Sequence, residues 1–324
     1  MEFKAETGSE AYLDLLEAVV DNGRKIAPRD QATREITNVQ VIISDARYAH
    51  VLGTKRRVNK NIMATETLQL LAGMSNLAQL DAASKGRFTR YADNGRLVGA
   101  YGPRVHQQLW RAVNLLQKDP DTRQAVITIW NGEEQVGIVK DVPCTQTLQF
   151  LIRGGQLRMR VNMRSSDAFL GIPYDWFMFS RLQMVVADHL GLEVGSFTHT
   201  AMSQHLYEEH LEQANHIIDE DVDDAMEKAI PPALLGDDDP ETQFGAAGNQ
   251  LIRSQSLAGM ICQGFSRDWQ ENLHRYTEDV QWYLSHVPQQ ANMVCCPKCR
   301  YVLDDFEVRF TPAGYACDQC EAGK

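Results

Sequence analysis

The stretch from residue 143 to residue 175 constrains the fold more than any other part of the chain. Within it, an apolar run over residues 148–152 and an alternating run over residues 157–163 flank a Gly-Gly pair. Glycine adopts left-handed turn conformations without strain, so this arrangement predicts a tight β-hairpin. A Gly-Ile-Pro-Tyr-Asp turn then leads into residues 176–190, an apolar segment with helical character. The sequence therefore predicts a hairpin connected to a buried helix.

The same stretch carries side chains suited to covalent chemistry and to anion binding. Cys144 lies just before the first apolar run, and a thiolate is a strong nucleophile. Arg164 and Ser165 follow the second run, where a guanidinium can fork onto phosphate oxygens and a hydroxyl adds a neutral donor. Taken alone, Cys144 could also be a small buried side chain, and Asp175 could be a helix cap. The wider pattern is needed to choose between these interpretations.

The wider pattern resembles the thymidylate synthase superfamily. The signature of that superfamily has Pro-Cys, Gln-Phe, Arg-Ser-x-Asp and a Leu-Gly-hydrophobic-Pro-aromatic-Asn turn in this order. The corresponding residues here are Pro143-Cys144, Gln149-Phe150, Arg164-Ser165-Ser166-Asp167 and Leu170-Gly171-Ile172-Pro173-Tyr174-Asp175. The resemblance covers about residues 10–215. It implies an α/β (α+β) fold of three layers with a large mixed sheet.

Two departures from this signature resemble the deoxycytidylate 5-hydroxymethylase branch. Thr145 follows the cysteine where synthases have His, and Asp175 ends the turn where synthases have Asn. The resemblance implies transfer of a one-carbon unit from 5,10-methylenetetrahydrofolate to C5 of a cytidine monophosphate, with dCMP as the first choice. Addition of water then gives the 5-hydroxymethyl nucleotide.

The resemblance assigns the catalytic roles to three residues. Cys144 adds to C6 of the pyrimidine ring, and Asp175 accepts from the amino edge of cytosine. Glu66 organises the water and shuttles protons. Glu66 also attracts attention by itself, because a carboxylate within the leucine-rich pattern of residues 60–80 costs free energy unless it is paired or functional.

The resemblance also assigns binding residues. The nucleotide is expected to contact Arg29, Arg123, Arg164, Ser165, Asp175, His205 and Tyr207, with Arg34 as the alternative to Arg29. The folate is expected to contact Tyr101, Asp167 and Tyr174, although Asp167 could instead cap the neighbouring turn. Arg123 reaches the phosphate of the other subunit in this family, so a homodimer is implied. The family normally has Asp two residues before its His-x-Tyr; Ser203 replaces it here, and hydroxymethylase-like sequences show the same loss.

The remaining core elements follow from periodicity and capping signals. We expect a helix over residues 9–21 capped by Ser9, a polar loop over residues 24–36, a strand over residues 37–45, a helix from Lys60 to Leu80 and a strand after Arg123.

The C-terminal third has a different composition. Residues 219–243 are acidic and broken by proline, which predicts a surface loop, and residues 248–287 predict two helices. Two C-x-x-C pairs follow, a spacing typical of a structural zinc site. The expected ligands are Cys296, Cys299, Cys317 and Cys320; Cys295 is a neighbour outside the set, and Cys262 is a core residue. The predicted parts are a catalytic core over residues 1–218, an acidic loop with a helical extension over residues 219–290 and a zinc ribbon over residues 291–324.

Composition limits the class of protein. The net charge of −11 over 324 residues argues against a general nucleic-acid coat, which needs a basic face. We expect no membrane span, because no apolar run reaches about 18 residues. The start of the chain lacks the pattern of a signal peptide. Of the seven cysteines, five lie between residues 295 and 320, which favours a metal site in a reducing compartment. We therefore expect a cytoplasmic protein, or one in the host cytoplasm if a phage encodes it.

Three alternatives stay open. The chain could be a C5 methyltransferase of the synthase type acting on dUMP or dCMP, or a hydroxymethylase of the ribonucleotide CMP. It could also be a nucleic-acid-binding module with an inactive core. Formation of dihydrofolate would separate a methyl product from a hydroxymethyl product. A hydroxymethylated cytosine nucleotide would fit DNA hypermodification by a phage or antibiotic biosynthesis by a bacterium.

Overall fold

The computed structural model describes residues 1–51, 53–73, 75–132 and 139–219, together with four short strands near the C-terminus. The chain divides into two compact units. Among the described residues, the first unit contains Met1–Val58, Arg111–Trp130 and the segment from Cys144 to the end of helix α6, and the second contains Asn59–Trp110 and Asn131–Pro143.

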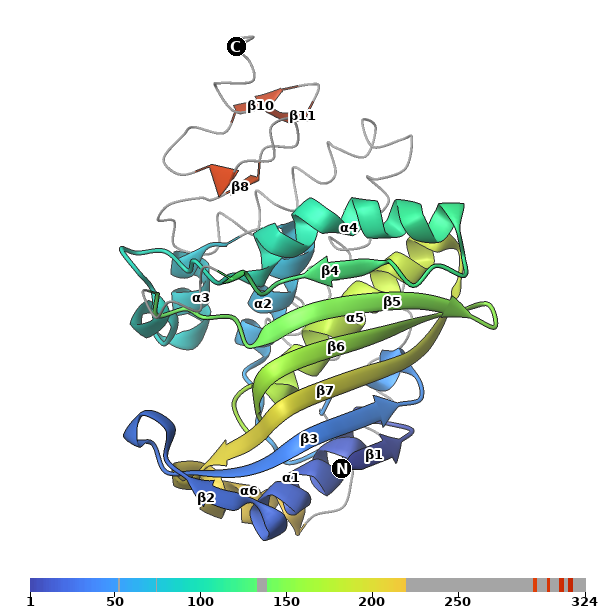
Figure 1. Ribbon diagram of the computed structural model, residues 1–324. Helices are drawn as coiled ribbons and strands as arrows, with labels where there is room; N and C mark the ends of the chain where they lie inside the picture. Colours follow the sequence, from blue (N-terminus) through green and yellow to red (C-terminus); the bar gives the residue numbers. More distant parts are fainter. Residues whose placement is uncertain are drawn as a thin grey trace, which may run out of the picture. The chain divides into compact units, whose positions relative to one another are not determined.

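The first unit is built on a mixed sheet of seven strands, six of them in the order β1-β3-β7-β6-β5-β4 and β2 paired with β3 (Figure 1). The strands are β1 (Glu2–Ala5), β2 (Arg24–Ile26), β3 (Thr33–Ile43), β4 (Val126–Thr128), β5 (Thr145–Arg153), β6 (Gln156–Asp167) and β7 (Glu193–Tyr207). The pairs β1–β3 and β6–β7 are parallel, and the other pairs are antiparallel. The large mixed sheet that the resemblance implied is therefore confirmed.

The predicted hairpin is formed by β5 and β6. Gly154 and Gly155 connect the two strands with φ angles of 61° and 76°, the left-handed values that a two-residue hairpin turn requires. The polar end of this hairpin leads through a short turn into α5 (Ile172–Leu190), so the predicted buried helix is also present.

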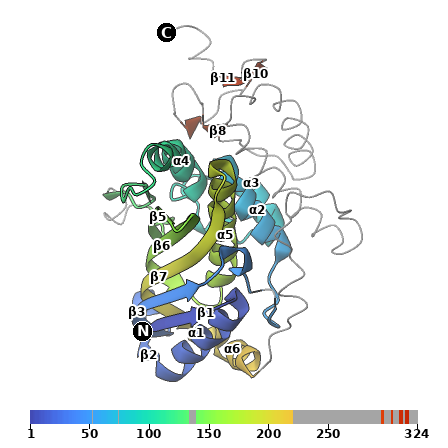
Figure 2. The same ribbon diagram turned by 90° about the vertical axis from the view of Figure 1, so that its right-hand side faces the viewer.

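Three helices of the first unit, α1 (Gly8–Asn22), α5 and α6 (Leu211–Ile218), lie on the same side of the sheet (Figure 2). The core between α5 and the sheet is aromatic, because Trp176, Phe177 and Phe179 of α5 are fully buried. Removal of this apolar surface from water holds the helix against the strands. The first turn of α5 contains Asp175, one of the expected site residues.

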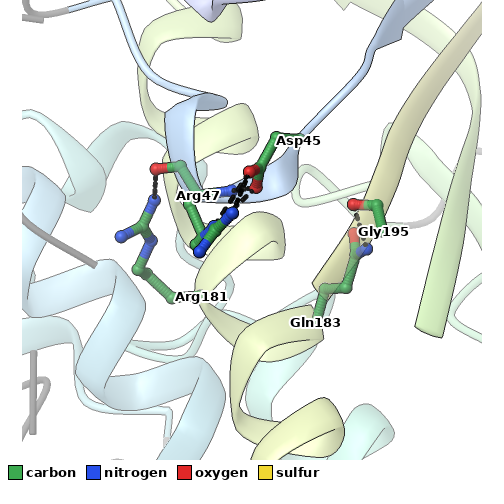
Figure 3. A network of polar contacts seen from close by, with 5 residues as sticks. All are labelled: Asp45, Arg47, Arg181, Gln183 and Gly195. Atoms are coloured by element: carbon green, nitrogen blue, oxygen red, sulfur yellow. Dashed lines mark hydrogen bonds and ion pairs between the residues drawn. The ribbon is translucent and has the colours of Figure 1, made fainter. Parts of the chain in front are cut away.

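Two polar side chains fix α5 further along its length (Figure 3). Gln183 is buried and its Nε2 donates to the carbonyls of Leu157, Gly195 and Ser196, which attaches the helix to β6 and β7. Arg181 donates to the carbonyl of Arg47 at 2.8 Å, and burial lowers the pKa of Arg181 to about 10. These bonds set the rotation of α5 relative to the sheet.

Helix α1 begins one residue earlier than expected. Thr7, rather than Ser9, is the N-cap: its side chain accepts from the backbone N–H of Glu10, whose carboxylate accepts from the N–H of Thr7. The Ser9 hydroxyl is used elsewhere and accepts from the N–H of Gly53 at 3.0 Å. The expected cap was therefore wrong, because a capping box two residues upstream competes for the same helix end.

The polar segment 24–36 is not a simple loop. It contains β2, a 3-10 turn η1 (Pro28–Asp30) and the first residues of β3, which begins at Thr33 rather than at residue 37. β2 and β3 pair as an antiparallel hairpin. Its residues are mostly exposed or half-buried, so they carry polar side chains that resemble a loop in sequence.

The buried positions shift within four neighbouring strands. On either side of the shift, the buried residues mostly lie two positions apart along the strand. At the shift two consecutive residues are not buried, so that the buried positions change from odd to even residue numbers or from even to odd. The shifts lie between Ile36 and Val39 in β3, Thr145 and Leu148 in β5, Met163 and Ser166 in β6, and Ala201 and Gln204 in β7. The strand pairing places these shifts side by side across the sheet. Beyond them, a set of polar residues shares one face of β3, β6 and β7.

The second unit contains α2 (Lys60–Ala72), α3 (Leu77–Ser84), the 3-10 turn η3 (Phe88–Tyr91) and the beginning of α4 (Tyr101–Lys118). The single helix expected from Lys60 to Leu80 is therefore two helices. Gly73, with a φ angle of 69°, ends the first. Gln69 replaces the interrupted backbone bonds, because its amide donates to the carbonyl of Asn76 and accepts from the N–H of Asn76.

Beyond residue 219 the structure describes only β8 (Val294–Cys295), β9 (Val302–Leu303), β10 (Arg309–Thr311) and β11 (Gly314–Ala316), which pair as β8–β9 and β10–β11. The expected zinc ligands, Cys262 and the segments 219–243 and 248–287 lie outside the described residues. Among the described helices, none combines the length and the apolar character needed to cross a membrane.

Candidate functional site

The end of the hairpin brings the candidate nucleophile beside a guanidinium. The carbonyl of Cys144 accepts from the N–H of Arg164 at 2.9 Å, which fixes the two residues next to each other at the start of β5 and within β6. One guanidinium nitrogen of Arg164 lies 3.8 Å from Cys144 Sγ. A positive charge at this distance favours the thiolate form of a cysteine.

Trp130 adds an aromatic side chain to this pair. The Arg164 guanidinium lies 5.5 Å from the centre of the Trp130 ring, and the backbone N–H of Trp130 donates to the carbonyl of Gln146. This cation–π contact holds the arginine in place beside the sulfur. The sequence analysis did not single out Trp130, whose only signal was an aromatic residue shortly after a strand.

A polar cluster lies on one face of β3, β6 and β7, beyond the line of shifts. His205 on β7 pairs with Glu35 on β3 and with Asp167 on β6, so the three side chains leave the sheet on one face. The hydroxyl of Ser165 lies 3.3 Å from His205 Nδ1, and the Tyr207 ring lies edge-on to the imidazole at 5.3 Å. Burial lowers the pKa of His205, and the carboxylates of Asp167 and Glu35 oppose this effect.

Asp167 shapes the turn that leads to α5. Its Oδ1 accepts from the N–H groups of Phe169 and Leu170 at 2.7 and 2.8 Å, so the carboxylate caps the turn. Burial raises the pKa of Asp167, and these two backbone bonds oppose the rise. The same carboxylate lies close enough to affect both His205 and Asp175.

Asp175 lies in the first turn of α5, and the pKa of its carboxyl is unusually high. Burial of its carboxyl raises the pKa to about 7, and the negative charge of Asp167 adds to the rise. Gly171 leaves room for this group, because a Cβ at residue 171 would lie 3.2 Å from Asp175 Oδ2 and 3.1 Å from the Asp167 carbonyl oxygen. Near neutral pH this carboxyl can therefore hold or release a proton.

The loop before β3 places Arg29 within electrostatic range of this cluster, since its charge lowers the pKa of His205. Arg29 is exposed and has a φ angle of 53°, a conformation uncommon for a residue with a side chain. The alternative residue, Arg34, donates to the Val20 carbonyl at 2.6 Å and pairs with Glu208 at 3.5 Å. These contacts give Arg34 a structural role.

Arg123 is exposed at the start of the segment that leads into β4, and its carbonyl accepts from the side chain of Gln149 at 3.0 Å. The backbone of Arg123 is therefore fixed while its guanidinium faces solvent.

Arg56, which the sequence analysis also missed, supports the turn after Asp167. Its guanidinium donates twice to the Phe169 carbonyl, at 3.2 and 2.9 Å, and lies 4.1 Å from the centre of the Phe169 ring. The same ring stacks with His210 at 4.7 Å. Two residues far apart in sequence, Arg56 before β5 and His210 after β7, therefore hold Phe169 and its turn in place.

The other expected residues lie in several places. Tyr174 is half-buried in the first turn of α5, next to Asp175. Glu66 is half-buried in α2 and Tyr101 is the first residue of α4, both in the second unit. Within the described parts of the chain, no cluster of His, Cys, Asp and Glu could hold a metal ion. The zinc prediction rests on cysteines outside these parts.

A comparison with known protein families agrees with this arrangement. The family model described as thymidylate synthase matches residues 10–231, which is more than half of the chain. The match includes the hairpin, the Asp167 turn, the first turn of α5 and the cluster around His205.

Proposed function

The chain belongs to the thymidylate synthase family, and we propose that it is a deoxycytidylate hydroxymethylase. Family membership makes it an enzyme that transfers a one-carbon unit from methylenetetrahydrofolate to C5 of a nucleotide. The proposed reaction converts dCMP, 5,10-methylenetetrahydrofolate and water into 5-hydroxymethyl-dCMP and tetrahydrofolate. The observation that carries this proposal is the position of Asp175, half-buried in the first turn of α5, where burial of its carboxyl and the nearby charge of Asp167 raise its pKa to about 7.

Base selection follows from hydrogen-bond chemistry. Cytosine presents an amino donor at C4 and an unprotonated N3, whereas uracil presents an N–H at N3 and an acceptor at O4. The carboxyl of Asp175 can accept from the amino group and share its proton with N3, because its pKa is close to neutral. With uracil the ionised form of the carboxyl would face O4, and an unpaired buried acceptor costs about 1–3 kcal/mol. This difference favours cytosine.

The covalent step needs Cys144. Its thiolate adds to C6 of the ring, and the electrons moved to C5 make that carbon nucleophilic. C5 attacks the methylene carbon carried by the folate and then loses its proton. Departure of the folate nitrogen leaves an exocyclic methylene, water adds to it, and the C6–sulfur bond breaks. The support in the structure is the Arg164 guanidinium, 3.8 Å from Sγ, which favours the charged nucleophile.

The remaining roles follow the family pattern. Glu66 organises the attacking water, and Tyr101, Asp167 and Tyr174 contact the folate. Arg29, Arg164 and Ser165 bind the phosphate, together with Arg123 from the partner subunit in a homodimer. His205 and Tyr207 bind the sugar hydroxyl. Supporting observations are the electrostatic reach from Arg29 to His205 and the exposed side chain of Arg123.

The test is product analysis with three nucleotides. The purified enzyme is incubated with 5,10-methylenetetrahydrofolate and dCMP, CMP or dUMP, products are identified by mass spectrometry, and dihydrofolate is followed by absorbance. We expect 5-hydroxymethyl-dCMP without dihydrofolate. Dihydrofolate together with a methylated product would identify a methyltransferase instead, and faster turnover of CMP would identify a ribonucleotide enzyme.

A separate part of the proposal concerns zinc. We propose that Cys296, Cys299, Cys317 and Cys320 bind one structural zinc, on the basis of their two C-x-x-C pairs. Metal analysis of the purified chain should give about one zinc per chain. Replacement of Cys296 and Cys299 by serine should abolish this zinc content, and unchanged zinc content in that variant would refute the assignment.

A further inference from the structure

The face that carries His205 also carries a carboxylate with no role in the proposed reaction. Glu35 on β3 lies directly opposite His205 on β7 in the antiparallel register, so the two side chains are neighbours on one face. Ser203 lies on the same face, two residues before His205. Its hydroxyl donates to Glu35 Oε1 at 2.5 Å. Glu35, Ser203 and His205 therefore form one contiguous group.

The type of residue at position 203 explains why the contact between Ser203 and Glu35 is important. The synthase pattern has Asp at this position, whereas this chain has Ser203, and hydroxymethylase-like sequences also lack the Asp. A serine hydroxyl has no negative charge, but here it binds the carboxylate of the adjacent strand. The negative charge that the pattern expects on β7 is therefore supplied from β3 by Glu35.

The negative charge of Glu35 acts on His205, which also contacts residues of β6. Ser165 contacts His205 Nδ1 at 3.3 Å, and Asp167 on β6 lies on the side opposite to Glu35. Glu35 and Asp167 are the two carboxylates that favour the protonated form of the buried imidazole, against the effects of burial and of Arg29. Loss of Glu35 would leave Ser203 without its acceptor and would weaken the donor character of His205.

We infer that Glu35 is a positioning residue of the sugar subsite, which acts through Ser203 and His205 on the hydroxyl of the bound nucleotide. This inference rests on the proposed function, because that function places the sugar 3′-hydroxyl at His205 and Tyr207. Glu35 on β3 thus takes the place of the carboxylate that the synthase pattern has on β7.

The test measures binding of two ligands that differ in one hydroxyl. Affinities of the full chain for dCMP and for 2′,3′-dideoxycytidine monophosphate are determined by calorimetry. We expect Glu35→Ala to weaken dCMP binding about tenfold and binding of the dideoxy compound less than about twofold. The turnover number at saturating dCMP should stay within about twofold, because the reacting carbon is remote from the sugar contact.

A rescue variant and a control sharpen this test. In Glu35→Ser with Ser203→Asp, the carboxylate is moved across the strand pair, and we expect dCMP affinity to return to within about threefold of the wild type. The control is Glu208→Gln, which changes a nearby carboxylate that pairs with Lys25 and Arg34 instead. This control should bind both ligands as the wild type does.

The outcomes separate the inference from the function. If Glu35→Ala weakens both ligands equally, or weakens neither, the positioning role is wrong while the proposed function stands. If the double variant binds dCMP no better than Glu35→Ala, the idea of a relocated carboxylate is also wrong. If the wild type does not bind dCMP at all, the proposed function fails and the inference fails with it.

Discussion

In the proposed function, the choice of base depends on a single side chain, Asp175. Replacement by asparagine exchanges an acceptor for an amide, which can accept from N3–H of uracil and donate to O4. We expect Asp175→Asn to lower kcat/KM for dCMP about tenfold to hundredfold and to raise activity with dUMP. Competition between the two nucleotides in one reaction measures the change directly. A variant that still prefers dCMP to the same degree would show that another residue reads the base.

The same side chain should make stability depend on pH. The pKa of Asp175 is about 7 in the folded protein against an ordinary value of 3.8, so the folded state binds this proton more tightly than the unfolded state. Its contribution to stability is fully present below about pH 4 and is lost as the pH rises through about 7. Between these pH values, the free energy of unfolding of the ligand-free wild type should fall by roughly 2–4 kcal/mol relative to Asp175→Asn.

Denaturant titrations of both proteins at several pH values check this prediction. Groups that titrate equally in the two proteins cancel in the difference, although Asp167 is electrostatically linked to Asp175 and contributes to it. A difference between the two proteins that stays constant from pH 4 to pH 7.5 would show that the carboxyl of Asp175 is not held in a buried state.

The turn between β6 and α5 is the structural element that orients this carboxyl. A Cβ at residue 171 would press on both Asp175 Oδ2 and the Asp167 carbonyl, at 3.2 and 3.1 Å. The φ angle of Gly171 is −97°, so alanine is compatible with the backbone and only its methyl group disturbs the site. We expect Gly171→Ala to weaken dCMP binding about tenfold while the free energy of unfolding changes by about 1 kcal/mol or less.

A matched control is Gly132→Ala. A Cβ at residue 132 would meet nothing within 4 Å, and the φ angle there is not in the left-handed region. Binding of dCMP, measured by calorimetry, should be unchanged in this control. Equal affinities of Gly171→Ala and the wild type would mean that the turn has room to relax around the methyl group.

The sequence analysis predicted the elements that depend on residues close together in the chain. The Gly-Gly pair specified the hairpin turn, and the apolar run over residues 176–190 predicted α5, which begins four residues earlier at Ile172. The resemblance and the family match agree on the hairpin and on the turn that contains Asp167. These features depend on residues adjacent in the chain, so the sequence alone contains the information.

The features that the sequence analysis missed depend on pairing between distant segments. Glu35 and Ser203 become neighbours only through the register of β3 and β7, 168 residues apart in sequence. Arg56 reaches the turn at Phe169 in the same way. The break at Gly73 was missed because the apolar spacing continues across it, while the Gln69–Asn76 bonds that stabilise the break leave no periodic signal.

At the scale of the whole molecule, the sheet face opposite the helices is where the proposed homodimer would bind its second copy. Gln40, Arg160, Asn162, Thr147 and Thr200 form cross-strand hydrogen bonds on it. On separate strands of the sheet, Met202 of β7 is 61% exposed and Val126 of β4 is 40% exposed. Exposed apolar side chains together with a cross-strand polar network would suit a symmetric interface between two sheets. In such a dimer each active site would receive Arg123 from the other subunit.

This arrangement predicts complementation between two inactive variants. Cys144→Ala removes the nucleophile and Arg123→Ala removes the guanidinium given to the partner, so each homodimer should be nearly inactive. A mixed dimer has one site with neither group and one site with both. After unfolding and refolding of an equal mixture, half of the dimers are mixed and half of their sites are intact, so activity should reach about a quarter of the wild-type value. The activity is measured with saturating dCMP and methylenetetrahydrofolate, and a mixture no more active than its components would show that Arg123 acts within its own subunit.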